Sequence, residues 1–116
     1  MKLSGLHVLK RNLGLPMLLI GTLVGAWSAT SRATSAEGAA LYKSNGCPVC
    51  HGQDGSHPVI QDYPVIAGQN ANFLLRQMRD IRDGRRTNGL SQIMREVVAP
   101  VTDEEFSSIS AWLALQ

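Results

Sequence analysis

Apolar residues recur at helical spacing in the second half of the chain. Between residues 70 and 83, one helical face carries Ala71, Leu74, Leu75, Met78 and Ile81. Gly84 follows this face as a stop signal, so the pattern predicts a helix over Asn70 to Asp83.

A second helix is predicted at residues 102 onward. Thr102 and Glu105 have the spacing of a capping box, in which each side chain satisfies the other's backbone N–H. The apolar stripe that follows is Phe106, Ile109, Trp112 and Leu113. The pattern therefore predicts that a helix begins after Thr102.

A third helix is predicted over Glu37 to Asn45, where Gly38 lies one turn before Tyr42. A glycine on that face permits close approach of another helix. Tyr42 and Trp112 are expected to be core residues that pack the first helix against the last. No segment alternates like a β-strand, so the expected fold is all-α, with three main helices. Two long loops, Gly52 to Gln69 and Arg85 to Pro100, are expected to join them.

The N-terminal residues have the pattern of a signal peptide. Basic residues precede an apolar stretch from Leu13 to Trp27, which is short for a membrane span. Cleavage is possible after Ala29, Ala33 or Ala36, and Ala36 is preferred because a helix pattern begins directly afterwards. We expect residues 1–36 to be a signal peptide and residues 37–116 a periplasmic domain; the alternative is an uncleaved segment that anchors the domain to the membrane.

Composition limits what this domain can be. The 116 residues suffice for one small domain and exclude a multidomain enzyme. Aromatic residues make up only 5% of the chain, so a cofactor is a candidate for filling the core. Residues 37–116 carry seven basic and nine acidic side chains, a net charge of −2, and no basic stripe of the kind that binds nucleic acid.

The motif Cys47-Pro48-Val49-Cys50-His51 carries the chemistry. C-x-x-C-H is the attachment site of c-type haem, in which each thiol adds to a vinyl group and the histidine coordinates the iron. We therefore predict one covalently attached haem c, held by Cys47 and Cys50, with His51 as an axial iron ligand.

Three other interpretations of the cysteines are weaker. A thioredoxin-like site needs a βαβ context that this chain lacks. A zinc site could use Cys47, Cys50, His51 and His57, but these ligands are crowded into one short segment. A disulfide between cysteines three residues apart would constrain the unfolded chain very little.

The second axial ligand must come from further along the chain, and the candidates are Met78, Met94 and His57. Met78 lies on a buried stripe, where methionine usually fills the core. His57 is too near His51 in sequence to reach the other side of the iron easily. Met94 is preferred; the alternative is that it is a surface or core methionine in a short helical turn, Ser91 to Val98.

Several segments together resemble one domain of the cytochrome c4 / c553 group of class I cytochromes c. They are Cys47-Pro48-Val49-Cys50-His51-Gly52, Tyr63-Pro64-Val65-Ile66-Ala67-Gly68-Gln69, Arg82-Asp83-Gly84-Arg85-Arg86-Thr87-Asn88, and Met94 eight residues before Thr102-Asp103-Glu104-Glu105. The resemblance spans residues 37–116 and implies a haem held between the first and last helices, with Met94 as the axial ligand. Many members of the group contain two haem domains, whereas this chain has one motif and is expected to be monohaem.

The resemblance also suggests how the site is supported. In such proteins the ligand histidine donates its other ring proton to a backbone carbonyl, and Pro58 and Pro64 are both candidates. Arg85, Arg86 and Asn88 are candidates for contacts to the haem propionates, and a solvated charged turn is the alternative.

With two axial ligands the expected function is one-electron transfer rather than catalysis. The protein would carry electrons from a periplasmic dehydrogenase or a membrane cytochrome complex to an oxidase, a reductase or another terminal acceptor. One alternative is the haem subunit of a larger periplasmic oxidoreductase, such as a sulfide dehydrogenase or another sulfur-oxidising complex. A distant alternative is a haem-based sensor in which Met94 is labile.

Overall fold

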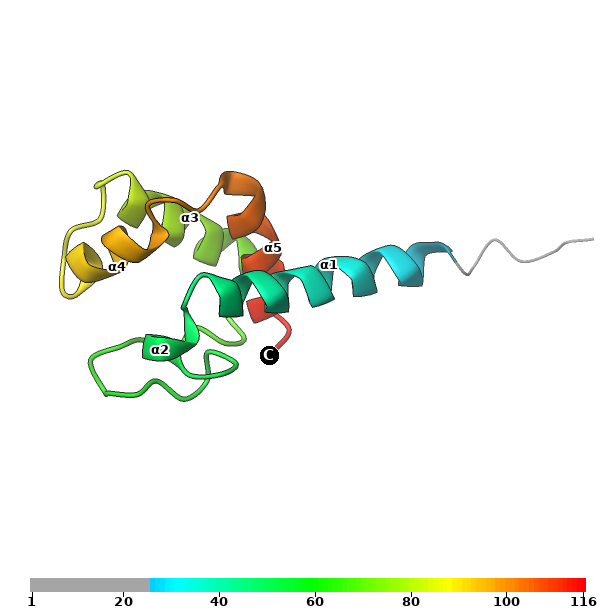
Figure 1. The fold of residues 1–116 in the computed structure, drawn as a ribbon, viewed down its shortest axis with the longest axis horizontal. Coiled ribbons are helices and arrows are strands. Elements are labelled where there is room, and N and C mark those ends of the chain that lie inside the picture. The colour runs from blue at the N-terminus through cyan, green and yellow to red at the C-terminus, as the bar shows by residue number, and fades with distance from the viewer. Residues whose placement is uncertain (1–25) are drawn as a thin grey trace, which may run out of the picture.

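Five helices form the regular structure of residues 26–116, the part of the chain that the computed structural model describes (Figure 1). They are α1 (Ala26–Ser44), α2 (Pro48–His51), α3 (Ala71–Arg82), α4 (Ser91–Val98) and α5 (Asp103–Leu113). No strand occurs within this part of the chain. The predicted all-α fold class is therefore confirmed.

Most of the predicted signal peptide lies outside the described residues, and it stays a prediction. Within residues 26–116, no helix is long and apolar enough to cross a membrane. Helix α1 begins at Ala26 rather than at Glu37, because the intervening residues include neither glycine nor proline to end it. The preferred cleavage position after Ala36 thus falls inside a continuous helix.

Helix α5 packs against both α1 and α3, and α4 packs against α3. Where α1 crosses α5, the two backbones approach closely at Gly38. A Cβ at that position would lie 2.6 Å from the Cβ of Trp112 and closer still to the carbonyl oxygen of Ser108. One turn later the rings of Tyr42 and Trp112 pack with centroids 4.9 Å apart and a tilt of 48°. The close approach was expected from the position of Gly38, and the aromatic contact from the prediction that Tyr42 and Trp112 are core residues of the first and last helices.

Caps fix the first turns of α3 and α5. The Asn70 side chain accepts a 3.1 Å hydrogen bond from the backbone N–H of Phe73, so α3 begins at Ala71, one residue from its predicted start. At α5, the hydroxyl of Thr102 accepts from the N–H of Glu105 at 3.2 Å. The Glu105 carboxylate accepts from the N–H of Thr102 at 2.9 Å. The predicted capping box is therefore present.

The core lies between α1, α3 and α5 and reaches the segment after α4. Its buried side chains are Tyr42, Leu74, Met78, Ile81, Val98, Val101, Phe106, Ile109, Trp112 and Leu113. Most of them belong to the apolar stripes that the sequence pattern identifies. The core ends at a hollow beside α2 and α4, which is the candidate functional site.

Helix α4 lies in the middle of the predicted loop Arg85 to Pro100, so the loop prediction was wrong for these residues. Its bounds are those of the alternative given above, the short helical turn Ser91 to Val98. Met94 and Val98 lie four residues apart on α4, and both face the hollow. Ile93 and Val97 have the same spacing and line the same hollow. The other predicted loop, Gly52 to Gln69, contains no helix.

Candidate functional site

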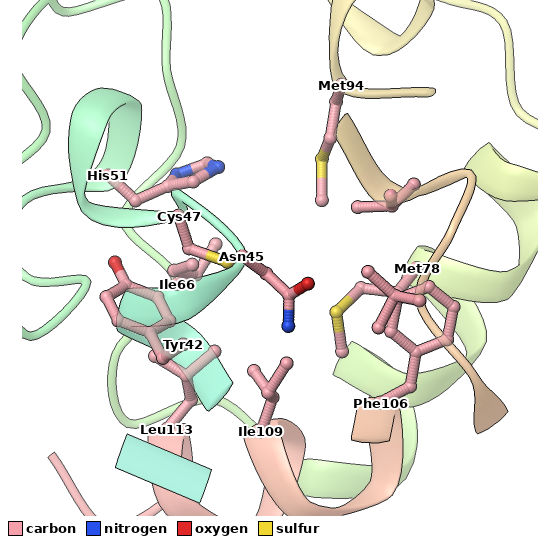
Figure 2. A pocket seen from close by; sticks show the side chains of 12 residues that line it. Tyr42, Asn45, Cys47, His51, Ile66, Met78, Met94, Phe106, Ile109 and Leu113 are labelled. Carbon is pink, nitrogen blue, oxygen red and sulfur yellow. The ribbon is translucent and has the colours of Figure 1, made fainter. Parts of the chain in front are cut away.

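A cavity of about 570 Å³ lies between α2 with its following loop on one side and α4 with the preceding turn on the other. Cys47, Cys50, His51 and Met94 all line it. A smaller pocket of about 30 Å³ continues inward, and its other walls include Tyr42, Met78, Phe106, Ile109 and Leu113 (Figure 2). Cys47, His51 and Met94 line both spaces, so the motif residues and the preferred methionine converge on one hollow.

His51 is the last residue of α2, and its side chain is buried, with 7% of the residue exposed. Its Nδ1 atom lies 3.1 Å from the carbonyl oxygen of Pro64. Because a carbonyl can only accept, Nδ1 carries the proton and Nε2 keeps a free lone pair. The structure therefore selects Pro64 over Pro58 as the partner of this ring.

The electrostatics of His51 suit a metal ligand. Burial lowers the pKa of His51, and the hydrogen bond to Pro64 partly opposes this effect. A neutral imidazole is the form that coordinates a metal. The local fold thus holds His51 in the required protonation state and orientation.

Cys47 and Cys50 are half-buried free thiols on the cavity wall. Burial raises the pKa of Cys47 to about 11, so this thiol is protonated at neutral pH. The structure shows no disulfide between the two cysteines. Both thiols are placed beside the space that a ligand would fill.

The alternative zinc site is not assembled. His57 is exposed, and its Nδ1 atom lies 2.6 Å from the hydroxyl oxygen of Ser56 rather than facing the cavity. Across residues 26–116, no three His, Cys, Asp or Glu side chains gather as metal ligands would. The four candidate zinc ligands, Cys47, Cys50, His51 and His57, therefore do not surround a single point where a metal ion could bind.

The structure also separates the three candidates for the second axial ligand. Figure 2 shows the imidazole of His51 and the side chain of Met94 entering the pocket from opposite sides. Met78 is buried on α3 and lines only the small inner pocket, while His57 lines neither space. Met94 is thus the only one of the three that lies on the wall of the large cavity.

Sequence reasoning assigned no role to Tyr63, which also lines the cavity. Its ring centroid lies 6.2 Å from that of His51, and the nearby Cys50 thiol raises the pKa of Tyr63. The segment Tyr63-Pro64 stood out only as a motif of the resemblance. A half-exposed aromatic residue in a loop has no periodic signal that would have revealed this contact.

Of the three candidates for propionate contacts, Arg86 and Asn88 line the cavity and Arg85 does not. Arg85 is exposed and forms ion pairs with Asp80 at 2.8 Å and Asp83 at 2.9 Å. Adjacent arginines in the same turn therefore have different surroundings.

Comparison with known proteins agrees with this geometry. Residues 35–115 match the family model described as Cytochrome c, and the chain belongs to the cytochrome c family, whose members are electron-carrying haem proteins. Within that family it falls in the c4 / c553 group of class I cytochromes c, and its single C-x-x-C-H motif makes it a monohaem member.

Three relatives define this placement. Cytochrome c4 of Pseudomonas aeruginosa is 38% identical over 74 residues, which are 64% of this chain and 35% of the relative. Cytochrome c-553 of Nitratidesulfovibrio vulgaris is 33% identical over 84 residues, 72% of this chain and 80% of the relative. A protein named thiosulfate dehydrogenase electron acceptor, from Stutzerimonas stutzeri, is 31% identical over 97 residues, 78% of this chain and 44% of the relative.

Among solved structures, reduced recombinant cytochrome c4 from Pseudomonas stutzeri superimposes with a TM-score of 0.63 and 28% sequence identity. The match covers 72% of this chain and 48% of that one. The chain thus spans less than half the length of the cytochrome c4 relatives that it matches. The shared region is one haem domain.

The prosthetic group of this family is covalently attached haem c, and the residues present fit it. Two thiols for the vinyl groups, a neutral imidazole with a free Nε2 and an apolar inner wall lie around one cavity. The predicted cofactor, haem c, is therefore supported by family and by donor chemistry.

Proposed function

We propose that this protein is a monohaem c-type electron carrier in which Cys47 and Cys50 hold the haem, and His51 and Met94 are its axial iron ligands. The observation that carries the proposal is the placement of His51 and Met94 on opposite sides of one cavity, with both cysteines on its wall (Figure 2). The bound haem supplies a one-electron Fe(II)/Fe(III) couple.

The chain's own residues favour electron transfer over substrate chemistry. When His51 and Met94 both serve as ligands, no open position faces the cavity for a substrate. The carbonyl of Pro64 keeps the His51 ring in one orientation, and the apolar inner wall excludes water. A neutral thioether ligand stabilises ferrous iron more than a second imidazole ligand would. With Met94 as the ligand, a fairly high reduction potential is therefore expected.

Optical spectra of paired methionine variants test this ligation. In the oxidised protein, Met94→Leu should abolish the weak sulfur-to-iron charge-transfer band, and its reduced form should bind carbon monoxide. Met78→Leu makes the same chemical change at a methionine that lines only the inner pocket, and it should retain the band. A band that survives in Met94→Leu would overturn the Met94 assignment. A wild-type protein that is high-spin or binds carbon monoxide readily would favour a sensor.

We also propose that the protein is exported by its N-terminal signal peptide and acts in the periplasm. There it accepts electrons from a dehydrogenase or a membrane cytochrome complex and passes them to a terminal acceptor. One relative carries the name thiosulfate dehydrogenase electron acceptor, which supports a dehydrogenase as the electron donor. Rapid-mixing reduction of the purified protein by a candidate dehydrogenase tests this role, and a failure to be reduced excludes that donor.

The same relative favours a second candidate, the haem subunit of a periplasmic sulfur-compound dehydrogenase. Size-exclusion chromatography of the native protein distinguishes the two. A free carrier elutes at the size of one small domain, whereas a subunit elutes with a larger partner.

A further inference from the structure

Helix α4 carries Met94, yet little of its surface is packed against the rest of the domain. It has eight residues, and a helix this short is not stable on its own in water. Of these residues only Ser91 and Val98 are buried, and Figure 1 shows α4 at the edge of the domain, beside α3. The position of Met94 therefore depends on the few contacts that fasten α4.

One of these contacts is made by the side chain next to Met94. The Nε atom of Arg95 donates a 3.3 Å hydrogen bond to the backbone carbonyl of Arg82, the last residue of α3. The guanidinium group also lies close to Gly84, where an added Cβ would be 3.3 Å from its Cζ and Nη1 atoms. The absence of a side chain at Gly84 thus gives Arg95 room to reach the end of α3.

Arg95 completes the C-terminal cap of α3. The last four carbonyl groups of a helix lack partners within it. Backbone N–H groups of the following turn satisfy three of them: Asp83 donates to Arg79 at 2.9 Å, Gly84 to Ile81 at 3.1 Å and Arg86 to Asp80 at 2.9 Å. The fourth carbonyl, that of Arg82, accepts from the side chain of Arg95 instead. A cation is favourable at this position, because the dipole of a helix is negative at its C-terminal end.

The side chain of Arg82 fastens the other end of α4. Its Nη1 atom donates to the carbonyl of Val101 at 3.1 Å, and the N–H of Val101 donates to the carbonyl of Val98 at 3.1 Å. Arg82 therefore holds α4 at two points, through its carbonyl at Arg95 and through its guanidinium group just after Val98. Within residues 26–116, Arg95 is exposed and forms no ion pair, so the bond to Arg82 is the one hydrogen bond of its side chain there.

We infer that Arg95 is a positioning residue for the axial ligand: by holding α4 against the end of α3, it keeps the sulfur of Met94 on the iron. The inference rests on the haem site proposed above. Arg95 and Met94 are adjacent on α4, so a helix fixed at Arg95 leaves Met94 little freedom to move away from the cavity. Displacement of Met94 from the iron then requires α4 to open and the bond between Arg95 and Arg82 to break.

The test is the binding of imidazole to the oxidised, haem-loaded protein, followed by the loss of the sulfur-to-iron charge-transfer band. An imidazole nitrogen replaces the sulfur of Met94, and the iron stays ferric throughout. Arg95→Ala should bind imidazole more tightly than the wild type by about two- to tenfold, because the variant has no hydrogen bond to break. Alanine is the better helix former, so a tighter binding cannot result from a weaker helix propensity of α4.

Two other substitutions to alanine are the matched controls. Arg76→Ala removes an exposed arginine of α3, and Glu96→Ala changes the exposed residue that follows Arg95 on α4. Neither residue forms an ion pair in the described part of the chain, and both variants should bind imidazole as the wild type does. Arg95→Lys keeps the charge and a donor for the carbonyl of Arg82, so it should recover part of the difference.

Hydrogen exchange measures the opening of α4 directly. The backbone N–H of Met94 donates to the carbonyl of Leu90 at 3.2 Å. In Arg95→Ala this N–H should exchange faster by about two- to tenfold. If Arg95→Ala lowers the free energy of unfolding but leaves imidazole affinity unchanged, Arg95 only stabilises the fold and the inference is wrong. An equal change of affinity in Arg76→Ala or Glu96→Ala would also overturn it.

If Arg95→Ala fails to load haem, NMR of the wild-type protein decides the question. The Nε–H of Arg95 should exchange with water more slowly than that of Arg76, and this protection should be lost when imidazole binds. Equal rates, or protection that persists with imidazole bound, would exclude the positioning role. A wild-type protein without the charge-transfer band would contradict Met94 ligation and hence the proposed function. A normal band with wild-type imidazole affinity in Arg95→Ala would contradict only the role of Arg95.

Discussion

The phenol of Tyr42 donates a 2.7 Å hydrogen bond to the backbone carbonyl of Gly52, the residue that follows His51. Tyr42 is fully buried, and burial raises its pKa well above the usual value, so the hydroxyl keeps its proton. This bond joins α1 directly to the chain that leaves the haem-attachment motif.

Tyr42→Phe removes this bond while keeping the ring. The half-buried carbonyl of Gly52 then lacks its partner, and the free energy of unfolding of the haem-loaded protein should fall by about 1 kcal/mol. Urea unfolding measures the change. Tyr63→Phe makes the same chemical change at a half-buried ring on the cavity wall and should cost less. Equal losses in the two variants would show that the bond to Gly52 has no particular role.

Gly38→Ala tests the crossing of α1 and α5. In an exposed helix, alanine is more stable than glycine by about 0.5–1 kcal/mol. Here the added methyl group would collide with backbone and Cβ atoms of α5, so a loss of about 1–3 kcal/mol is expected in thermal or urea unfolding. Ala40→Gly, at an exposed position of α1, measures the propensity effect alone. A stabilised Gly38→Ala protein would contradict the close crossing.

Asp103 joins α5 to α3 through ion pairs with Arg82 at 2.8 Å and Arg79 at 3.0 Å. These arginines, Arg82 first, hold the pKa of Asp103 below its usual 3.8. Because the native state favours the carboxylate, the pair stabilises the fold above pH 3.8, and this contribution is lost as the pH falls below that value. Unfolding of Asp103→Asn, measured from pH 7 to pH 3, should start from a lower free energy and decline less steeply at acid pH.

Glu104→Gln is the control for Asp103→Asn. It removes a charge from the same first turn of α5, at an exposed residue with no ion pair in the described part of the chain. High salt should reduce the difference between wild type and Asp103→Asn, because the pair is partly exposed. An equal effect of both substitutions would instead indicate an interaction with the helix dipole.

Local signals explain which helices could be predicted. The caps at Asn70 and Thr102 act over three residues, so the starts of α3 and α5 were correct to within one residue. Helix α4 has two apolar pairs at four-residue spacing on the wall of the hollow, Ile93 with Val97 and Met94 with Val98, and it packs against segments that are distant in sequence. The short helical turn Ser91 to Val98 was therefore available from the local pattern as an alternative, whereas the cavity that it lines is set by the tertiary fold.

In the candidate site, too, some residues could be identified from the sequence and others only from the fold. The C-x-x-C-H motif is readable because covalent chemistry demands both residue types and their spacing. A backbone carbonyl has no side-chain signature, so Pro58 and Pro64 were equivalent until the folded loop placed Pro64 at His51. The sequence also could not distinguish Arg85 from Arg86. The fold of the turn after α3 directs Arg85 to the aspartates and Arg86 to the cavity. The role of Met94 stays a prediction that its placement supports.

The loop that carries Pro64 is fastened by main-chain atoms. The N–H groups of Ile66 and Ala67 donate to the carbonyl of Gly55, and that of Gly68 donates to the carbonyl of Leu113 at 2.9 Å. Such bonds do not depend on side-chain identity. The loop should therefore accept many substitutions between residues 56 and 65. The glycines with positive φ on either side of this stretch, Gly55 and Gly68, should be kept. A single inserted or deleted residue would shift the register of the bonds that hold Pro64 against His51, so loop length is constrained far more strictly than loop sequence.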